Sequence, residues 1–263
     1  MKKAWMMCAA LLLIVTACTA QPVKSMPQPT PETVKEAVAA PVVTPRPTPT
    51  LAPKPTPTPD EPGKVVLAEG FYYFELSEGL KARITGKSYP ADEKNCKIGY
   101  DDLRCVKLLH YDFEGIIHEG ELIVHALLAA EVTEIFYELY KAQYPLYSVR
   151  LIDDFGADDD LSMEANNTSA FNYRQVEGSR SLSLHSFGAA IDINPFFNPY
   201  VEKGRVSPES AAAFADRSRD FAGKIDKDDL CYKLLTERGW TWGGQWRSCQ
   251  DYHHFQKDIG FER

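Results

Sequence analysis

The chain lacks several features that would indicate common classes of protein. It contains no basic run, and its 29 Lys and Arg residues against 37 Asp and Glu residues give a formal net charge of −8 at pH 7. Surfaces that bind nucleic acid concentrate Lys and Arg, so nucleic acid is a poor candidate partner. No sustained coiled-coil or exposed apolar repeat is visible either, and we therefore expect a monomer.

A long apolar run is also missing from the N-terminus. The run from Ala4 to Val15 is too short to span a bilayer comfortably, and it follows Lys2 and Lys3. A short apolar run behind basic residues is typical of a secretory signal. We predict a signal peptide over residues 1–17 and exclude it from fold reasoning.

The four residues Val15-Thr16-Ala17-Cys18 resemble the bacterial lipobox, in which small residues precede a cysteine that receives diacylglycerol. The resemblance implies that Cys18 is lipidated and becomes the new N-terminus. The protein would then be anchored to a membrane on the extracytoplasmic side of a bacterial cell envelope, with one or two membranes. A plain signal peptide followed by a chance cysteine is the alternative.

Residues 18–63 have a composition that cannot form a packed core. Of the 18 prolines in the chain, 13 lie between Thr19 and Gly63, as in TPRPTPTLAPKPTPTP. Such a segment favours extended polyproline II, and at about 3.1 Å per residue it could reach on the order of 140 Å. We predict a disordered linker that tethers the domain behind it. A mere spacer or a glycosylated stalk remains open.

Residues 64–263 are long enough for one domain with a sizeable core. Strand and helix patterns are interspersed in this part of the sequence, which predicts an α+β fold: a single compact domain with a small, mostly antiparallel sheet and flanking helices. The expected elements are strands in KVVLAEGFYYFEL (64–76) and YSVRLID (147–153), one long amphipathic helix over 122–143, and helices over 207–220 and 230–239.

Four cysteines lie in the predicted domain: Cys96, Cys105, Cys231 and Cys249. An even number in an exported domain favours disulfides, and sequence alone allows three connectivities. We prefer Cys96 with Cys105 and Cys231 with Cys249, because these pairs close the shortest loops. A zinc site of four thiolates is disfavoured, since the C-x2-C spacing is absent.

The stretch SLHSFGAAID, residues 183–192, combines a histidine, a glycine and a carboxylate with an apolar run. Alternation from Ala190 onward predicts a strand in which Asp192 faces away from Ile191. Gly188 would let the backbone turn, so that His185 and Asp192 converge on one point. Imidazole and carboxylate suit Zn²⁺, and a catalytic zinc site needs a third protein ligand and an open position.

The later stretch DYHHFQ, residues 251–256, offers that third ligand. His254 could bind the metal and Asp251 could take a proton from water, while His253 is a competing ligand that spacing cannot reject. Strand alternation would place Asp251 and His254 on opposite faces. A turn between them is therefore required if they act together.

These two stretches resemble one known family. Residues 183–192 match S-x-H-x-x-G-x-A-x-D and residues 251–254 match D-x-x-H, the two motifs of the bacterial zinc D-alanyl-D-alanine carboxypeptidase and L-alanyl-D-glutamate endopeptidase family. The resemblance extends over roughly residues 100–256, through NNTSAFNYR, ADRSR and RGWTWGG. It implies that His185, Asp192 and His254 are the zinc ligands and that Asp251 is the general base.

The same resemblance implies two further roles. Arg174 corresponds to the family's residue that steadies the carbonyl oxygen of the scissile bond, although Arg180 and Arg247 are nearby arginines. Ser183 corresponds to a motif serine near the ligands that helps to hold substrate. Gln245 is a departure, because relatives tend to carry an aspartate in WGGDW, and it leaves substrate recognition open.

The expected function is therefore a zinc-dependent D,D-carboxypeptidase that removes terminal D-alanine from peptidoglycan stem peptides. An L-Ala-D-Glu-type endopeptidase with the same site is the close alternative. A cell-wall-binding module without catalysis is a third, and the presence of Asp251 and all three ligands disfavours it.

Overall fold

The computed structural model describes residues 61–261, and the predicted signal peptide, the lipidation at Cys18 and residues 18–60 of the predicted linker lie outside this range. No described helix is both long and apolar enough to cross a membrane. The α-helices are α1 (Glu78–Ile84), α2 (Ala129–Lys141), α3 (Asp159–Glu164) and α4 (Leu230–Glu237). The 3₁₀ helices are η1 (Glu93–Asn95), η2 (Tyr100–Asp102), η3 (Ile152–Phe155), η4 (Leu184–Phe187), η5 (Glu209–Phe214) and η6 (Gly243–Gln245).

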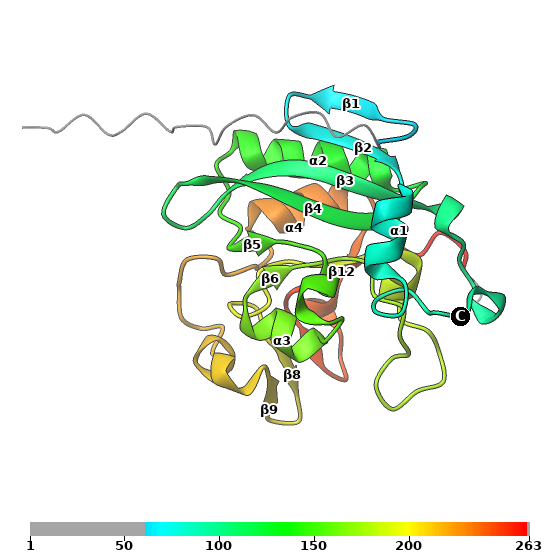
Figure 1. Cartoon of the computed structure of the whole chain (residues 1–263). Coiled ribbons are helices and arrows are strands. Elements are labelled where there is room, and N and C mark those ends of the chain that lie inside the picture. Colours follow the sequence, from blue (N-terminus) through cyan, green and yellow to red (C-terminus); the bar gives the residue numbers. More distant parts are fainter. Residues whose placement is uncertain (1–60, 262–263) are drawn as a thin grey trace, which may run out of the picture. The chain divides into compact units, whose positions relative to one another are not determined.

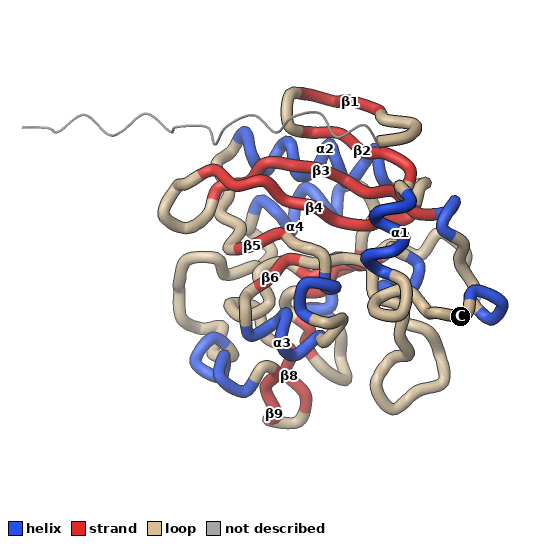
Figure 2. Tube along the Cα trace, in the orientation of Figure 1, coloured by secondary structure: helices blue, strands red, loops and turns tan. Residues whose placement is uncertain are grey.

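The largest sheet contains four antiparallel strands in the order β1-β2-β3-β4 (Figures 1 and 2). These strands are β1 (Val65–Ala68), β2 (Phe71–Glu75), β3 (Leu103–Tyr111) and β4 (Ile117–His125). Helix α2 packs against β3 through buried Val132, Ile135, Phe136 and Leu139, which recur at the spacing of one helix face. This packing forms the main hydrophobic core.

Three smaller sheets carry the rest of the domain. The first has the order β10-β12-β7, with β10 (Thr241–Trp242), β12 (His254–Gln256) and β7 (Ala190–Asp192). The second has the order β11-β8-β9, with β11 (Gln250–Asp251), β8 (Tyr200–Glu202) and β9 (Arg205–Ser207). The third pairs β5 (Ser148–Val149) with β6 (Asn167–Thr168). All described strand pairs except β5 with β6 are antiparallel. The predicted α+β class with a mostly antiparallel sheet is confirmed.

The β10-β12-β7 sheet is fixed to helix α2 by one carboxylate. Glu131 accepts hydrogen bonds from Trp240 Nε1 (2.7 Å) and from Lys257 Nζ (2.8 and 2.9 Å). Trp240 precedes β10 and Lys257 follows β12, and the Lys257 backbone N–H also donates to the Ala189 carbonyl oxygen (2.9 Å). The strand that carries His254 is therefore held at both of its edges and at its end.

The prediction of one long helix over 122–143 is wrong in its first part. Residues up to His125 continue β4, and α2 begins only at Ala129. Leu122, Ile123 and Val124 are all buried, so apolar side chains point to both faces of this strand and imitate a helix pattern. His125, expected on the helix, is the last residue of β4.

Two other predicted elements are shorter than expected. The predicted strand over 147–153 is reduced to β5 and is followed by the 3₁₀ helix η3, and the predicted helix over 207–220 is the short 3₁₀ helix η5. The helix predicted over 230–239 is confirmed as α4. Asp229 caps its start by accepting from two backbone N–H groups, and Gly239 follows its end with φ +84°.

The predicted disulfides do not form, because all four described cysteines are free thiols. Cys105 lies within β3 and is fully enclosed by the core. Cys96 directly follows η1, and its Sγ lies 3.5 Å from the Asp92 carbonyl oxygen. Cys231 is buried in the first turn of α4, and Cys249 lines an open cleft. The hydrophobic core, rather than cross-linking, closes this domain.

Gly188 makes the turn that the sequence predicted. It ends η4 in the left-handed conformation (φ +64°), and a Cβ atom there would lie 2.5 Å from the backbone nitrogen of His125. That nitrogen donates to the Gly188 carbonyl oxygen at 2.9 Å. Glycine is thus required twice, for the backbone conformation and for the close approach of the loop to β4.

We predict that Gly188→Ala lowers the free energy of unfolding by about 3 kcal/mol, from the left-handed conformation plus forced repacking. Gly156 is the matched control, since it also ends a 3₁₀ helix at positive φ (+69°) but has nothing within 4 Å of a Cβ atom. Gly156→Ala should cost about 1 kcal/mol, from the left-handed conformation alone. Urea unfolding of both variants measures the difference, and equal losses would contradict the close-approach argument.

Candidate metal centre

Three side chains meet at one point from three different segments. His185 lies on η4, Asp192 ends β7 and His254 begins β12. In the antiparallel pair of β7 and β12, Asp192 lies directly opposite His254. Directly paired residues have Cβ atoms about 4.5–5.5 Å apart on the same face of the sheet. The predicted strand from Ala190 is confirmed, with Ile191 fully buried on the other face.

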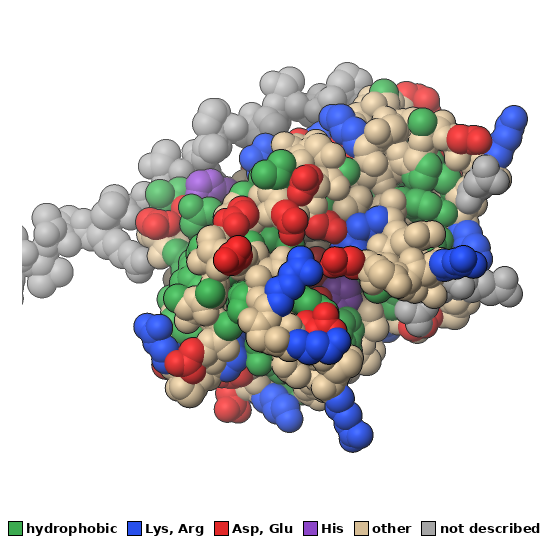
Figure 3. All heavy atoms as spheres, turned by 90° about the horizontal axis from the view of Figure 1, so that it is seen from below, with side chains coloured by type: hydrophobic (Ala, Val, Ile, Leu, Met, Phe, Trp, Pro, Cys, Tyr) green, Lys and Arg blue, Asp and Glu red, His purple; other side chains and the backbone are tan. Residues whose placement is uncertain are grey.

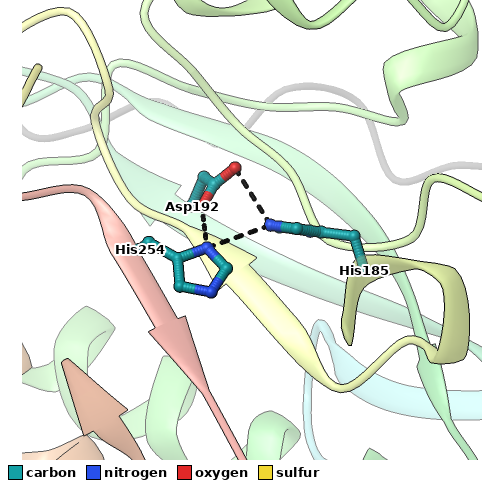
Figure 4. Close-up of side chains that lie close together, drawn as sticks. All are labelled: His185, Asp192 and His254. Atoms are coloured by element: carbon teal, nitrogen blue, oxygen red, sulfur yellow. Dashed lines mark hydrogen bonds and ion pairs between the residues drawn. The ribbon is translucent and has the colours of Figure 1, made fainter. Parts of the chain in front are cut away.

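The spacing of the three side chains fits one small cation (Figure 4). His185 Nε2 lies 3.2 Å from Asp192 Oδ2 and 3.2 Å from His254 Nδ1, and His254 Nδ1 lies 3.0 Å from Asp192 Oδ1. Ligand atoms held 2.0–2.1 Å from a tetrahedral zinc ion are about 3.3 Å apart. The donor atoms are therefore already at coordination spacing.

The outer ring nitrogens of both histidines are occupied by acceptors. His185 Nδ1–H donates to the Ala170 carbonyl oxygen (2.5 Å), and His254 Nε2–H donates to Gln256 Oε1 (3.0 Å). In a neutral imidazole the other nitrogen then carries a lone pair. The lone pairs of the two histidines and the Asp192 carboxylate then face one another. These negative groups repel one another unless a cation lies between them. The chemistry of the donor set thus fits a bound metal ion.

The pKa values of Asp192 and His254 without a metal ion also reflect the attraction between this carboxylate and positive charge. Burial would raise the pKa of Asp192, but the charges of His185 and His253 hold it well below its usual range. Burial would lower the pKa of His254, yet its hydrogen bond to Asp192 raises it overall. The charge of Asp192 thus favours a proton on His254 when no metal ion is bound.

His253, the competing ligand, points to a different place. Its Nδ1–H donates to the Asn198 carbonyl oxygen (2.7 Å), and its Nε2 lies 2.9 Å from Asp251 Oδ1 and 3.9 Å from Asp192 Oδ1. Burial would lower the pKa of His253, but the two carboxylates outweigh it and raise the pKa to about 9. His253 is thus a buried cation between Asp251 and Asp192 and does not belong to the trio.

Asp251 reaches the cleft because the chain bends. Residues 252–253 form a bend between β11 and β12, which is the turn that the pairing of Asp251 with His254 requires. Gly243 lies against both residues: a Cβ atom there would be 2.8 Å from Asp251 Cβ and 3.3 Å from His254 Cβ. The WGG segment therefore packs beneath the site and leaves no room for a side chain.

Arg174 lines the same cleft as the trio, whereas Arg180 and Arg247 are exposed and do not line it. Its backbone is fixed to η4, since its N–H donates to Ser186 Oγ (2.9 Å) and its carbonyl oxygen accepts from the same hydroxyl (2.7 Å). Its side chain forms a close ion pair with Asp159. No pattern in the sequence pointed to Asp159.

Ser183 and Gln245 have structural contacts. Ser183 caps η4 by accepting from the His185 backbone N–H (3.3 Å), and it also lines the cleft. Gln245 is exposed and donates to the Tyr232 hydroxyl (2.7 Å), outside the residues that line the cleft. Substrate contact by Ser183 stays a prediction.

The trio opens into a cleft of about 540 Å³. Figure 3 shows histidine side chains at the bottom of a hollow, with acidic and basic side chains on its rim. A neighbouring hollow of about 600 Å³ shares Asp160, Arg205 and Ser207 with this cleft. The neighbouring hollow lacks the donor trio, so we place the chemistry in the cleft that contains it.

Sequence reasoning missed two residues beside His254. The Trp246 ring lies 5.3 Å from the His254 ring, and Gln256 holds the outer nitrogen of that histidine. Gln256 could have been found from the sequence, because it follows His254 by two residues and residues two apart on a strand share a face.

We predict a pH-dependent stability in the chelator-treated protein. Folding raises the pKa of His253 from 6.5 to about 9, so protonated His253 stabilises the fold. Its contribution to the free energy of unfolding, on the order of 3 kcal/mol, is complete below pH 6.5 and is lost as the pH rises through 9. Unfolding free energies measured from pH 6 to 10 should fall for the wild type and fall less steeply for His253→Gln.

His118→Gln is the control. The His118 side chain is 46% exposed and pairs with Asp112, and neither residue belongs to the trio or contacts His253. It should keep the wild-type slope. The same slope in His253→Gln would show that the buried charge does not lie on His253.

The comparisons with known proteins support the predicted family. A family model described as D-alanyl-D-alanine carboxypeptidase matches residues 177–257. No curated protein and no solved structure matches the chain. The matched segment contains both motifs and all three members of the trio, but it begins after Arg174 and is shorter than the range of 100–256 expected from the sequence. Over this segment the predicted family is confirmed, and it indicates a carboxypeptidase-like peptidase.

Proposed function

Because residues 177–257 match this peptidase family, we propose that the chain is a zinc-dependent D,D-carboxypeptidase acting on the terminal D-Ala-D-Ala bond of peptidoglycan stem peptides. One observation carries the proposal beyond the family match. His185 Nε2, His254 Nδ1 and the Asp192 carboxylate lie at ligand spacing, with both outer ring nitrogens already bonded to acceptors.

The residues divide the chemistry between them. A zinc ion held by His185, Asp192 and His254 would act as a Lewis acid that lowers the pKa of water and polarises the scissile carbonyl. Asp251 takes a proton from the attacking water and returns it to the leaving amine. Buried His253, 2.9 Å from Asp251, keeps that carboxylate oriented.

Arg174 supplies positive charge at the cleft wall. Its guanidinium is oriented by Asp159 and its backbone is bonded to η4, the segment that carries His185. A cation fixed in this way stabilises the carbonyl oxygen as it gains negative charge, and no reorganisation is needed during the reaction.

The proposal includes the place of action. The predicted signal peptide, lipidation at Cys18 and proline-rich linker would tether a monomeric catalytic domain to a membrane of the bacterial cell envelope. The linker would let it reach wall peptides at a distance from that membrane.

An endopeptidase of the L-Ala-D-Glu type is the second candidate, and the adjoining hollow favours it. Because the two hollows share Asp160, Arg205 and Ser207, a longer peptide could extend past the trio on the side of β9. A carboxypeptidase needs room for a single residue beyond the scissile bond, whereas an endopeptidase needs more.

Incubation of the purified chain with a muropeptide pentapeptide should release free D-alanine, and a chelator should abolish the release until Zn²⁺ is restored. Mass spectrometry of the products distinguishes the candidates: cleavage between L-Ala and D-Glu would replace the first proposal with the second. If no fragment appears with any metal, the peptidase proposal fails.

Asp251→Asn should bind zinc like the wild type and lower kcat by about 10²–10⁴-fold, because the amide cannot accept the proton. Asp228→Asn, at an exposed aspartate, is the matched control and should keep full activity. Metal content and turnover are measured on the same preparations. Full activity in Asp251→Asn would refute its assignment as the base.

A further inference from the structure

His254 and Gln256 lie two residues apart on β12 and share one face of the strand. Between them Phe255 is fully buried in the core, which fixes the strand in rotation. Gln256 pairs with Ala190 across the sheet, and its carbonyl oxygen accepts from Thr241 Oγ1 (3.2 Å). The Gln256 side chain is therefore anchored at its backbone and reaches His254 with Oε1 at 3.0 Å.

The two histidines of the trio are oriented by different kinds of group. The Ala170 carbonyl oxygen that holds His185 belongs to the backbone and can only accept. The partner of His254 is a side-chain amide, which has one end that accepts and one that donates. Only the accepting end places the proton on Nε2 and leaves Nδ1 free to face Asp192, 3.0 Å away.

We propose that Gln256 is a positioning residue that sets the ring tautomer of His254 and thereby the metal affinity of the centre. This inference rests on the proposed metal centre. Acceptors behind a ligating histidine fix its ring and raise its basicity, and their loss typically weakens metal binding 10–100-fold. The Trp246 ring, 5.3 Å from His254, bounds the imidazole but offers it no acceptor in this arrangement.

The first test compares zinc affinities of the full chain by competition with a chromophoric chelator. Gln256→Met keeps the side-chain length but removes the acceptor, and it should weaken zinc binding 10–100-fold. Gln256→Glu restores an acceptor and should bind at least as tightly as the wild type. Weak binding by both variants would mean that Gln256 acts through packing and would overturn the proposal.

Gln250→Met is the matched control. Gln250 lies on β11, which precedes β12 in the chain but belongs to a different sheet, and its amide donates to the Trp246 carbonyl oxygen (3.1 Å). The same substitution there leaves His254 and its acceptor in place. It should keep wild-type affinity. Equal affinity in Gln256→Met and Gln250→Met would also overturn the proposal.

A second measurement separates this inference from the metal centre itself. Nitrogen-15 NMR of the metal-free Asp192→Ala protein, in which no carboxylate competes for the Nδ1 proton, is measured at a pH where His254 is neutral. It should show the His254 proton on Nε2 when residue 256 is Gln or Glu, and a mixture of the Nε2–H and Nδ1–H tautomers when residue 256 is replaced by Met. If wild type binds zinc no better than His185→Ala, the metal centre fails. The NMR spectra still decide whether Gln256 sets the tautomer.

Discussion

The antiparallel pairing of β7 with β12 is the constraint on which the site depends. Its register sets Asp192 opposite His254, and a slip of one residue would replace one of these ligands by a core residue such as Ile191 or Phe255. The register is secured from outside the pair, because Glu131 on α2 holds Lys257 just beyond β12. The largest hydrophobic core thus fixes a contact between two short strands.

Two close approaches complete the centre. Gly188 lets η4 lie against the end of β4, which brings His185 over the strand pair, and Gly243 lets η6 lie against Asp251 and His254. The converging lone pairs and carboxylates cost electrostatic free energy without a cation, and buried His253 offsets part of it between Asp192 and Asp251. Local strain and repulsion at such a place are typical of functional sites.

Several elements differ from their sequence patterns for identifiable reasons. Residues 122–125 are buried on both faces of β4, so their apolar run imitates the helix that begins only at Ala129. The cysteine count favoured disulfides, yet Cys105 and Cys231 are enclosed in the core as small apolar residues. Composition could not distinguish these cases, because the burial of a residue depends on distant partners.

The sequence by itself determined the chemical groups and their local geometry: a histidine, a glycine turn and an alternating strand in residues 183–192, and a second motif in residues 251–254. With them it determined the similarity of residues 177–257 to a peptidase family. The motif resemblance already favoured His254 over His253, and the structure shows why: the His254 ring meets Asp192, whereas the His253 ring lies between Asn198 and Asp251. Only the tertiary structure decided that Asp159 holds Arg174 and that Gln256 holds His254. These choices follow from strand register, a bend and ring orientation, which arise from long-range packing and leave no periodic trace in the sequence.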